Sequence, residues 1–356
     1  MFSFLSNYHR RSGFTLPEIL VSTAVAAILG GIAYGLLSEG MGLYIRNLSL
    51  NKSENSLRSS IRRLKHDISL ATSTPQLVVY DPTKSPPVLM AVPAGTTTSQ
   101  GIRIMVNLGP AYSLLPTNAA SDVPPAPTTS APIYSSVNQL NYRLARCTSN
   151  TAPALPVASS DLRRSDRLVF LDPSPLPTQN VTETNGTYTV VTAKPGRRLV
   201  SVNMVSSVFV DVAVEDLSGS GQSIPAVTLY NSAYVVHEVA YVAYGYLDSS
   251  GNPVRELRYF PNAEDASTYT VICRDLDPTP QEKVNGVAVQ PFALVDSTSG
   301  TSLNVNFPVR ALDYAHAIAD RNLPPGQINV SSEFNVSISA KPQISPRITL
   351  FAISSN

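Results

Sequence analysis

One glutamate, Glu18, lies five residues into an apolar block near the N-terminus. An ionised carboxylate in such surroundings is costly unless a cation pairs with it. Gly13 directly precedes the block, and hydrolysis of the Gly13–Phe14 peptide bond would give Phe14 a new α-amino cation. A glutamate of one subunit could then neutralise the terminal amine of a neighbouring subunit, which would fix the register between packed helices. If this bond is cut, these residue types and spacings predict a buried ion pair between neighbouring subunits.

The apolar block is long enough to cross a membrane. Between Glu18 and Glu39 lie 20 consecutive residues without a charge, which as a helix reach about 30 Å, the thickness of the hydrocarbon core of a bilayer. We therefore expect residues 14–38 to span the membrane. Arg10 and Arg11 precede the span, so the positive-inside tendency predicts a cytoplasmic N-terminus and a head outside the cytoplasm.

Two other N-terminal segments compete with this interpretation. A secretory signal would place its small-residue cleavage site after the apolar run, whereas Gly13 precedes the run and no A-x-A site follows before Glu39. A plain single-span anchor would need no acid at its start. Glu18 therefore favours a processed and assembled helix over both.

The run Gly13-Phe14-Thr15-Leu16-Pro17-Glu18, followed by about 20 apolar residues, resembles the class III leader and N-methylation motif of type IV pilins and type II secretion pseudopilins. The resemblance implies that residues 1–13, with the basic pair Arg10 and Arg11, are a leader peptide. A prepilin peptidase would cut after Gly13 and methylate Phe14, and Glu18 would serve docking between subunits. The implied partners are this peptidase and other pilin or pseudopilin subunits. The implied location is the inner membrane and then a periplasmic or extracellular filament.

The helix is predicted to continue beyond the membrane, from residue 14 to 72. Apolar residues at helical spacing form one stripe, and Thr74-Pro75 ends the pattern. The stripe consists of Leu43, Leu50, Leu57, Ile61, Leu64, Ile68 and Ala71. We expect it to pack on the head. The basic cluster on the opposite side has acids and serines among its members, which favours a solvated face over a DNA or lipid site. This cluster comprises Arg58, Arg62, Arg63 and Lys65, with His66 beside it.

Glycines interrupt the span, and each costs up to about 1 kcal/mol of helix stability relative to alanine. We consider local melting near Gly30–Gly35 in an assembled filament, with close helix packing through small residues as the alternative.

Residues 73–356 read as a β-rich, loop-rich head, so the predicted fold class is α+β with a long N-terminal helix packed on that head. Short Val-, Tyr-, Ile- and Thr-rich runs alternate with Pro, Gly, Ser and Asn clusters. The predicted strands are 76–80, 102–106, 139–145, 167–170, 188–192, 205–214, 227–230, 233–247, 254–260 and 268–273, and a short helix is predicted at 311–320. Residues 233–247 and 254–260 should form a hairpin. The segment 121–132 is an irregular linker that could divide the head into two lobes.

The hairpin carries Arg255 and Arg258. In this layout the chain is similar to large minor pilins of the PilW type and to J-type pseudopilins.

Sites for catalysis or metal binding are weak in this sequence. His237-Glu238 begins a zincin-like pattern, but the second histidine is missing, and neighbouring residues of a strand face opposite sides. Asp275 and Asp277 match no calcium-loop spacing, and Asp313, His316 and Asp320 lack a nucleophile. We therefore predict no enzyme, metal or cofactor.

The cysteines and the net charge limit which compartment and which partners are expected for the chain. A disulfide between Cys147 and Cys273 is chemically permitted outside the cytoplasm, with two buried thiols as the alternative. Loss of Arg10 and Arg11 changes the formal charge from +1 to −1, so no bulk nucleic-acid binding is expected.

The function predicted from sequence is a minor, low-abundance pilin-like subunit that primes assembly or lies near the tip of a filament. One alternative is a filament-borne binding module, such as an adhesin or a DNA-uptake receptor. Others are a type II secretion pseudopilin and a membrane-anchored enzyme or receptor domain unrelated to filaments.

Overall fold

The computed structural model describes residues 15–107, 109–117, 135–147, 153–171, 178–184, 187–229, 232–247, 249, 251, 253–276, 283–284, 287–288, 290–297, 300–310 and 331–339. Its long helix, α1, spans Leu16–Ser69. By internal contacts, the helix residues up to Lys52 belong to one compact unit, and the residues from Ser53 onwards belong to a second unit with the head.

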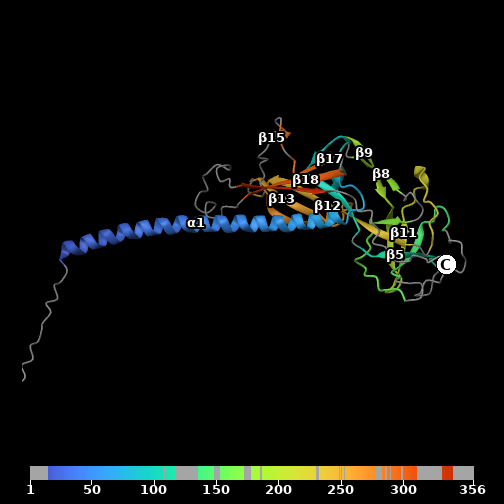
Figure 1. The fold of residues 1–356 in the computed structure, drawn as a ribbon, viewed down its shortest axis with the longest axis horizontal. Coiled ribbons are helices and arrows are strands. Elements are labelled where there is room, and N and C mark those ends of the chain that lie inside the picture. Colours follow the sequence, from blue (N-terminus) through green and yellow to red (C-terminus); the bar gives the residue numbers. More distant parts are fainter. Residues whose placement is uncertain are drawn as a thin grey trace, which may run out of the picture. The chain divides into compact units, whose positions relative to one another are not determined.

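The described part of the head is built from antiparallel strands and a short 3-10 helix, η1 (Ser218–Ser220) (Figure 1). The strands are β1 Gln76–Asp81, β2 Val88–Ala91, β3 Thr98–Ser99, β4 Gly101–Val106, β5 Ala111–Leu115, β6 Asn141–Ala145, β7 Arg167–Phe170, β8 Thr178–Thr184, β9 Thr189–Pro195, β10 Arg197–Met204, β11 Phe209–Val214, β12 Ser232–Leu247, β13 Pro253–Phe260, β14 Thr270–Leu276, β15 Lys283–Val284, β16 Val287–Ala288, β17 Phe292–Ser297, β18 Gly300–Arg310 and β19 Ser331–Ser339.

Strand β12 belongs to two sheets. Its first residues, up to Val236, pair with β5 and β7, whose sheet continues through β6, β11 and β10. From His237 onwards it pairs with β4 and β13, and this second sheet continues through β14, β18 and β17. The helix followed by a strand-rich head confirms the predicted α+β class.

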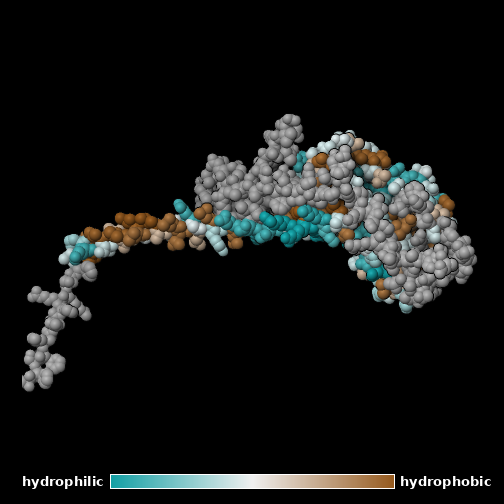
Figure 2. All heavy atoms as spheres, viewed as in Figure 1, coloured by the Kyte–Doolittle hydropathy of each residue, from teal (hydrophilic) through white to brown (hydrophobic). Residues whose placement is uncertain are grey.

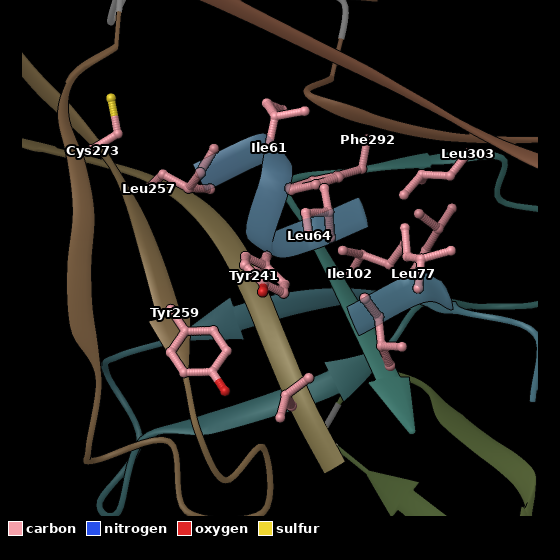
Figure 3. Packing of buried hydrophobic residues seen from close by; sticks show 14 of the residues in the cluster. Ile61, Leu64, Leu77, Ile102, Tyr241, Leu257, Tyr259, Cys273, Phe292 and Leu303 are labelled. Atoms are coloured by element: carbon pink, nitrogen blue, oxygen red, sulfur yellow. The ribbon is translucent and has the colours of Figure 1, made fainter. Parts of the chain in front are cut away.

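The last turns of α1 form one side of the core of the second sheet. Leu57, Ile61, Leu64 and Ile68 recur every three or four residues, so they share one face of the helix, and each is at most 3% exposed. They pack with side chains of β12, β13, β17 and β18, among them Tyr241 (Figure 3). Burial of each such side chain contributes roughly 1.5–3 kcal/mol.

A β-bulge lies where the helix meets this sheet. The register of β13 on β14 jumps between Leu257↔Cys273 and Arg258↔Val271, so Ile272 lies between the paired positions. Its carbonyl oxygen accepts hydrogen bonds from the hydroxyls of Ser56 and Ser60, at 3.0 and 3.1 Å. The two serines therefore satisfy a carbonyl that the bulge displaces from the ladder.

The sheet of β5, β6, β7, β10 and β11 has a separate core that includes Tyr142, Phe170, Leu199 and Val235. The face of the second sheet opposite the helix carries a smaller cluster with Val78 and Phe260.

Most predicted strands are confirmed with shifts of a few residues at their ends. They include the hairpin of β12 and β13, with Leu247 opposite Pro253, and β14 as its third strand. The predicted strand at 227–230 is wrong over its described residues: Val227 is fully buried but lies in a loop bound to Ser135. The strands β2, β3, β5, β8, β10 and β15 to β19 were not predicted.

The helix and its stripe also need correction. α1 ends at Ser69 and not near residue 72. Leu43, predicted to pack on the head, is 59% exposed, whereas Leu57 and the stripe residues that follow it are buried. The basic side chains Arg58, Arg62, Arg63, Lys65 and His66 are exposed, as a solvated face requires, while the Arg63 guanidinium lies 3.6 Å from the ring centre of Tyr259.

Arg258 is not a surface arginine. It is 7% exposed, its Nε donates to Glu256 at 2.7 Å, and its guanidinium lies 4.1 and 4.2 Å from the ring centres of Tyr244 and Tyr269. Cation–π contacts with two rings stabilise a partly desolvated cation, so the Arg258 side chain contributes to the packing of the head.

Candidate membrane and assembly segment

The first turn of α1 is closed by Glu18 itself. Thr15 is the residue before the helix, and both its backbone N–H and its hydroxyl donate to Oε2 of Glu18, at 2.9 and 3.0 Å. This is the backward arm of a capping box, in which an acid at the third helical position satisfies the N-cap amide. Pro17 lies within this turn, where a backbone N–H has no helical acceptor. The Thr15-x-x-Glu18 spacing could have indicated this cap from sequence.

The carboxylate of Glu18 is exposed in the single chain. Its other oxygen, Oε1, has no hydrogen-bond partner among the described residues. The positive end of the helix dipole favours an anion here. The side chain can thus close its own helix with one oxygen and present the other to a cation.

From Leu16 to Met41 the helix is apolar and uncovered. This stretch of 26 residues is long and apolar enough to cross a bilayer. Its large apolar side chains are between 48% and 76% exposed, and they form the brown segment of the helix in Figure 2. Exposed apolar surface of this extent requires a membrane or other helices around it.

The glycines of the span leave the helix surface open. An added Cβ at Gly30, Gly31 or Gly35 would meet nothing within 4 Å, and α1 is continuous through all three. Local melting concerned the assembled filament, so it stays a hypothesis.

The docked end of α1 carries one buried acid, Asp67, which is 4% exposed. The hydroxyl of Tyr241 on β12 donates to Oδ2 of Asp67 at 2.6 Å. Burial raises the pKa of Asp67, while the Tyr241 hydrogen bond and the nearby Arg63 charge lower it in part. Together with the bulge contacts, this bond joins the helix to β12.

The His237-Glu238 pair has no zincin-like geometry. His237 Nδ1 lies 3.0 Å from Asp166, while Glu238 is bound to Arg103 at 2.8 Å and to Lys194 at 2.8 Å. Burial alone would raise the pKa of Glu238, but the charges of Arg103 and Lys194 hold it below its ordinary value. The two neighbours thus contact different partners.

Glu238 belongs to a buried ion cluster that sequence reasoning missed. Arg103 also binds Glu183 of β8, at 2.7 Å, and Lys194 lies on β9. The cluster therefore ties the β8–β9 hairpin to β4 and β12. Its members are far apart along the chain, so no sequence signal pointed to it. Among the described residues, no group of three or more His, Cys, Asp or Glu side chains could hold a metal ion.

The disulfide considered from sequence is not formed. Cys147 and Cys273 are both buried thiols. Cys147 packs with Leu115 and Phe209, and Cys273 packs in the core beneath α1. Burial raises the pKa of the Cys147 thiol. The alternative of two separate thiols therefore describes these side chains.

Several predicted residues lie outside the described part of the chain. They are Arg10, Arg11, Gly13, Phe14, Asp277, Asp313, His316, Asp320, the linker 121–132 and the predicted helix at 311–320.

A comparison with protein families matched residues 8–34 to the prokaryotic N-terminal methylation motif. No curated protein and no solved structure gave a match to the chain. The matched residues include Gly13, Phe14 and Glu18 and run into the exposed apolar helix. The motif supports a class III leader and a type IV pilin-like or pseudopilin subunit associated with the membrane.

Proposed function

We propose that the chain is a minor type IV pilin-like subunit that is cut between Gly13 and Phe14, methylated on Phe14 and assembled through its helix. The observation that carries the proposal is the exposed apolar helix with Glu18 at its start, within the methylation motif. A membrane covers that helix before assembly, and helices of other subunits cover it afterwards.

The free oxygen of Glu18 supports the pairing step. In this proposal Oε2 keeps its bonds to Thr15, while Oε1 receives the terminal amine of the neighbouring subunit. A buried carboxylate and ammonium compensate each other only when both are present, so assembly depends on prior cleavage of the leader.

The size of the head supports a low abundance. The strands form two sheets with separate cores, whereas the helix that must pack in the filament is only about 10 Å wide. Heads of this size are easiest to accommodate when few copies are present or when they lie near a filament tip.

Two substitutions separate processing from assembly. Gly13→Ala should block cleavage and leave the leader on the protein. Glu18→Ala should allow cleavage but reduce incorporation into sheared filaments, while Glu39→Ala, a matched control on the same helix, should incorporate as wild type does. Equal incorporation of the Glu18 and Glu39 variants would contradict the assembly role. Finding the chain as the main protein of purified filaments would contradict the minor role.

A further inference from the structure

The hairpin of β8 and β9 leaves an open strand edge on the head. Within the described residues, the two strands pair only with each other, from Thr178↔Pro195 to Thr184↔Thr189. No described strand therefore pairs with the outer edge of β9, and such edges are templates for pairing with another chain.

Two hydrogen bonds show which backbone groups point outward from the hairpin. The N–H of Asn180, opposite Ala193, donates to the Gln222 side chain at 3.3 Å. The carbonyl of Pro195 accepts from Arg167 Nε at 2.9 Å. Both N–H and C=O of a residue point to the same side of an antiparallel strand, and that side alternates along the strand. Val191 and Ala193 therefore direct their N–H and C=O groups away from β8.

These groups have no hydrogen-bond partner among the described residues. The side chains at the same positions are also accessible, since Val191 is 61% exposed and Ala193 is exposed. The edge is thus open in both its backbone and its side chains.

A groove runs beside this edge. It is a cavity of about 510 Å³ with Thr192, Ala193 and Lys194 on one side. The residues that follow α1, 73–77, and the segment 92–96 line it as well, together with Leu294. Both the groove and the edge lie within the unit that begins at Ser53.

The charges around the groove are already paired. Its two cations, Arg103 and Lys194, are 3% and 2% exposed and bind Glu238 and Glu183. A charged occupant would be desolvated there without gaining a partner. Small and apolar residues such as Ala94, Gly95 and Leu294 make up other parts of the lining, so a peptide backbone can approach closely.

We propose that this groove receives an extended, uncharged segment of another protein, which adds to β9 as a strand through backbone hydrogen bonds. Strands in a sheet lie about 4.8 Å apart, so an added strand would occupy the part of the groove directly beside β9. A second copy of this chain could offer its β9 edge only together with the β8 strand paired to it. A single extended strand is therefore the better occupant. The inference does not depend on the filament proposal.

The probe is an acetylated and amidated peptide of alternating threonine and valine with a fluorescent label, titrated against the full chain in detergent. Binding should raise its anisotropy. Two further peptides are N-methylated at every second residue, one at the odd and one at the even positions. The peptide in which the methyl groups replace the N–H groups that face β9 should not bind, while the other should bind. A peptide with glutamate in place of threonine should bind more weakly.

A matched pair of variants tests the protein side. Ala193→Pro removes the outward N–H from an edge position, where proline is tolerated, and should weaken binding about tenfold, as expected for loss of one hydrogen bond. Ala193→Ser keeps the N–H and should bind as wild type does. Melting curves check that both variants fold.

Three results would overturn the proposal. The first is that the uncharged peptide does not bind the wild-type chain, and the second is that both N-methylated peptides bind. The third is that a Val191→Cys variant forms cross-linked dimers, which would show that two copies of the chain meet at this edge.

Discussion

Removal of the Tyr241 hydroxyl should loosen the attachment of α1 to the head. In the Tyr241→Phe variant, the buried Asp67 carboxylate loses its donor at 2.6 Å while the ring and its packing remain. A hydrogen bond to a charged group contributes about 1.5–3 kcal/mol, so we expect a loss of about 2 kcal/mol. For a domain of this size this corresponds to a decrease of about 4 °C in the melting temperature.

Tyr112 provides the control. It is 1% exposed, like Tyr241, but its hydroxyl has no hydrogen-bond partner among the residues that the structure describes. Tyr112→Phe removes an unsatisfied polar group, so the melting temperature should stay unchanged or rise. Both variants are measured by thermal unfolding of the full chain, followed by circular dichroism.

The effect should also depend on pH. Burial raises the pKa of Asp67 in the folded state. Below the unfolded-state pKa, the acid is protonated in both the folded and the unfolded state. As the pH rises through the folded-state pKa, the folded protein loses the stability that comes from its tighter proton binding at Asp67. Tyr241→Phe removes a contact that lowers this pKa, so its destabilisation should be largest at neutral pH and shrink as the pH falls. A Tyr241→Phe variant that melts like Tyr112→Phe at neutral pH would refute the reasoning.

Two further pairs test the head. Glu238→Gln leaves Arg103 and Lys194 with one carboxylate fewer inside the protein and should lower the free energy of unfolding by about 3–5 kcal/mol. Asp211→Asn removes a charge from a more exposed pair with Arg143 and should lower it by less than about 1 kcal/mol. Both values are measured by chemical denaturation, and equal losses would contradict the buried cluster. Gly196→Ala should severely impair folding, because its φ is +67° and a Cβ would lie 2.2 Å from the Leu168 carbonyl oxygen. Gly221→Ala, at φ +73° with open space around it, should cost only about 1–2 kcal/mol, so similar soluble yields of both variants would count against this packing.

The helix and its docked face were predictable because a period of three to four residues is a local signal. The spacing of Leu57, Ile61, Leu64 and Ile68 indicated one buried face. The same pattern could not show where packing begins, since Leu43 continues the stripe and yet is exposed. Periodicity identifies a face but not the partner that covers it.

Two of the strands that were not predicted carry residue types that are depleted in strands. β8 is rich in Thr, Asn and Gln, and β18 contains Pro308. Conversely, Val227 belongs to an apolar run that fills the core from a loop. Both errors arise because burial is decided by tertiary contacts, while sequence patterns report local preference.

The same distinction between local patterns and tertiary contacts applies to the residues of the candidate site. Glu18 stood out because one carboxylate in an apolar run needs a partner, and the adjacent motif gave its chemistry. The ion cluster around Glu238 and the open edge of β9 depend on residues that meet only after folding.

The mass of the mature N-terminus, measured on protein purified from cell membranes, tests the central claim most directly. We expect a chain that begins at Phe14 and carries one added methyl group on its α-amine. A mature protein that begins at Met1, or at any residue other than a methylated Phe14, would contradict processing and the assembly that depends on it.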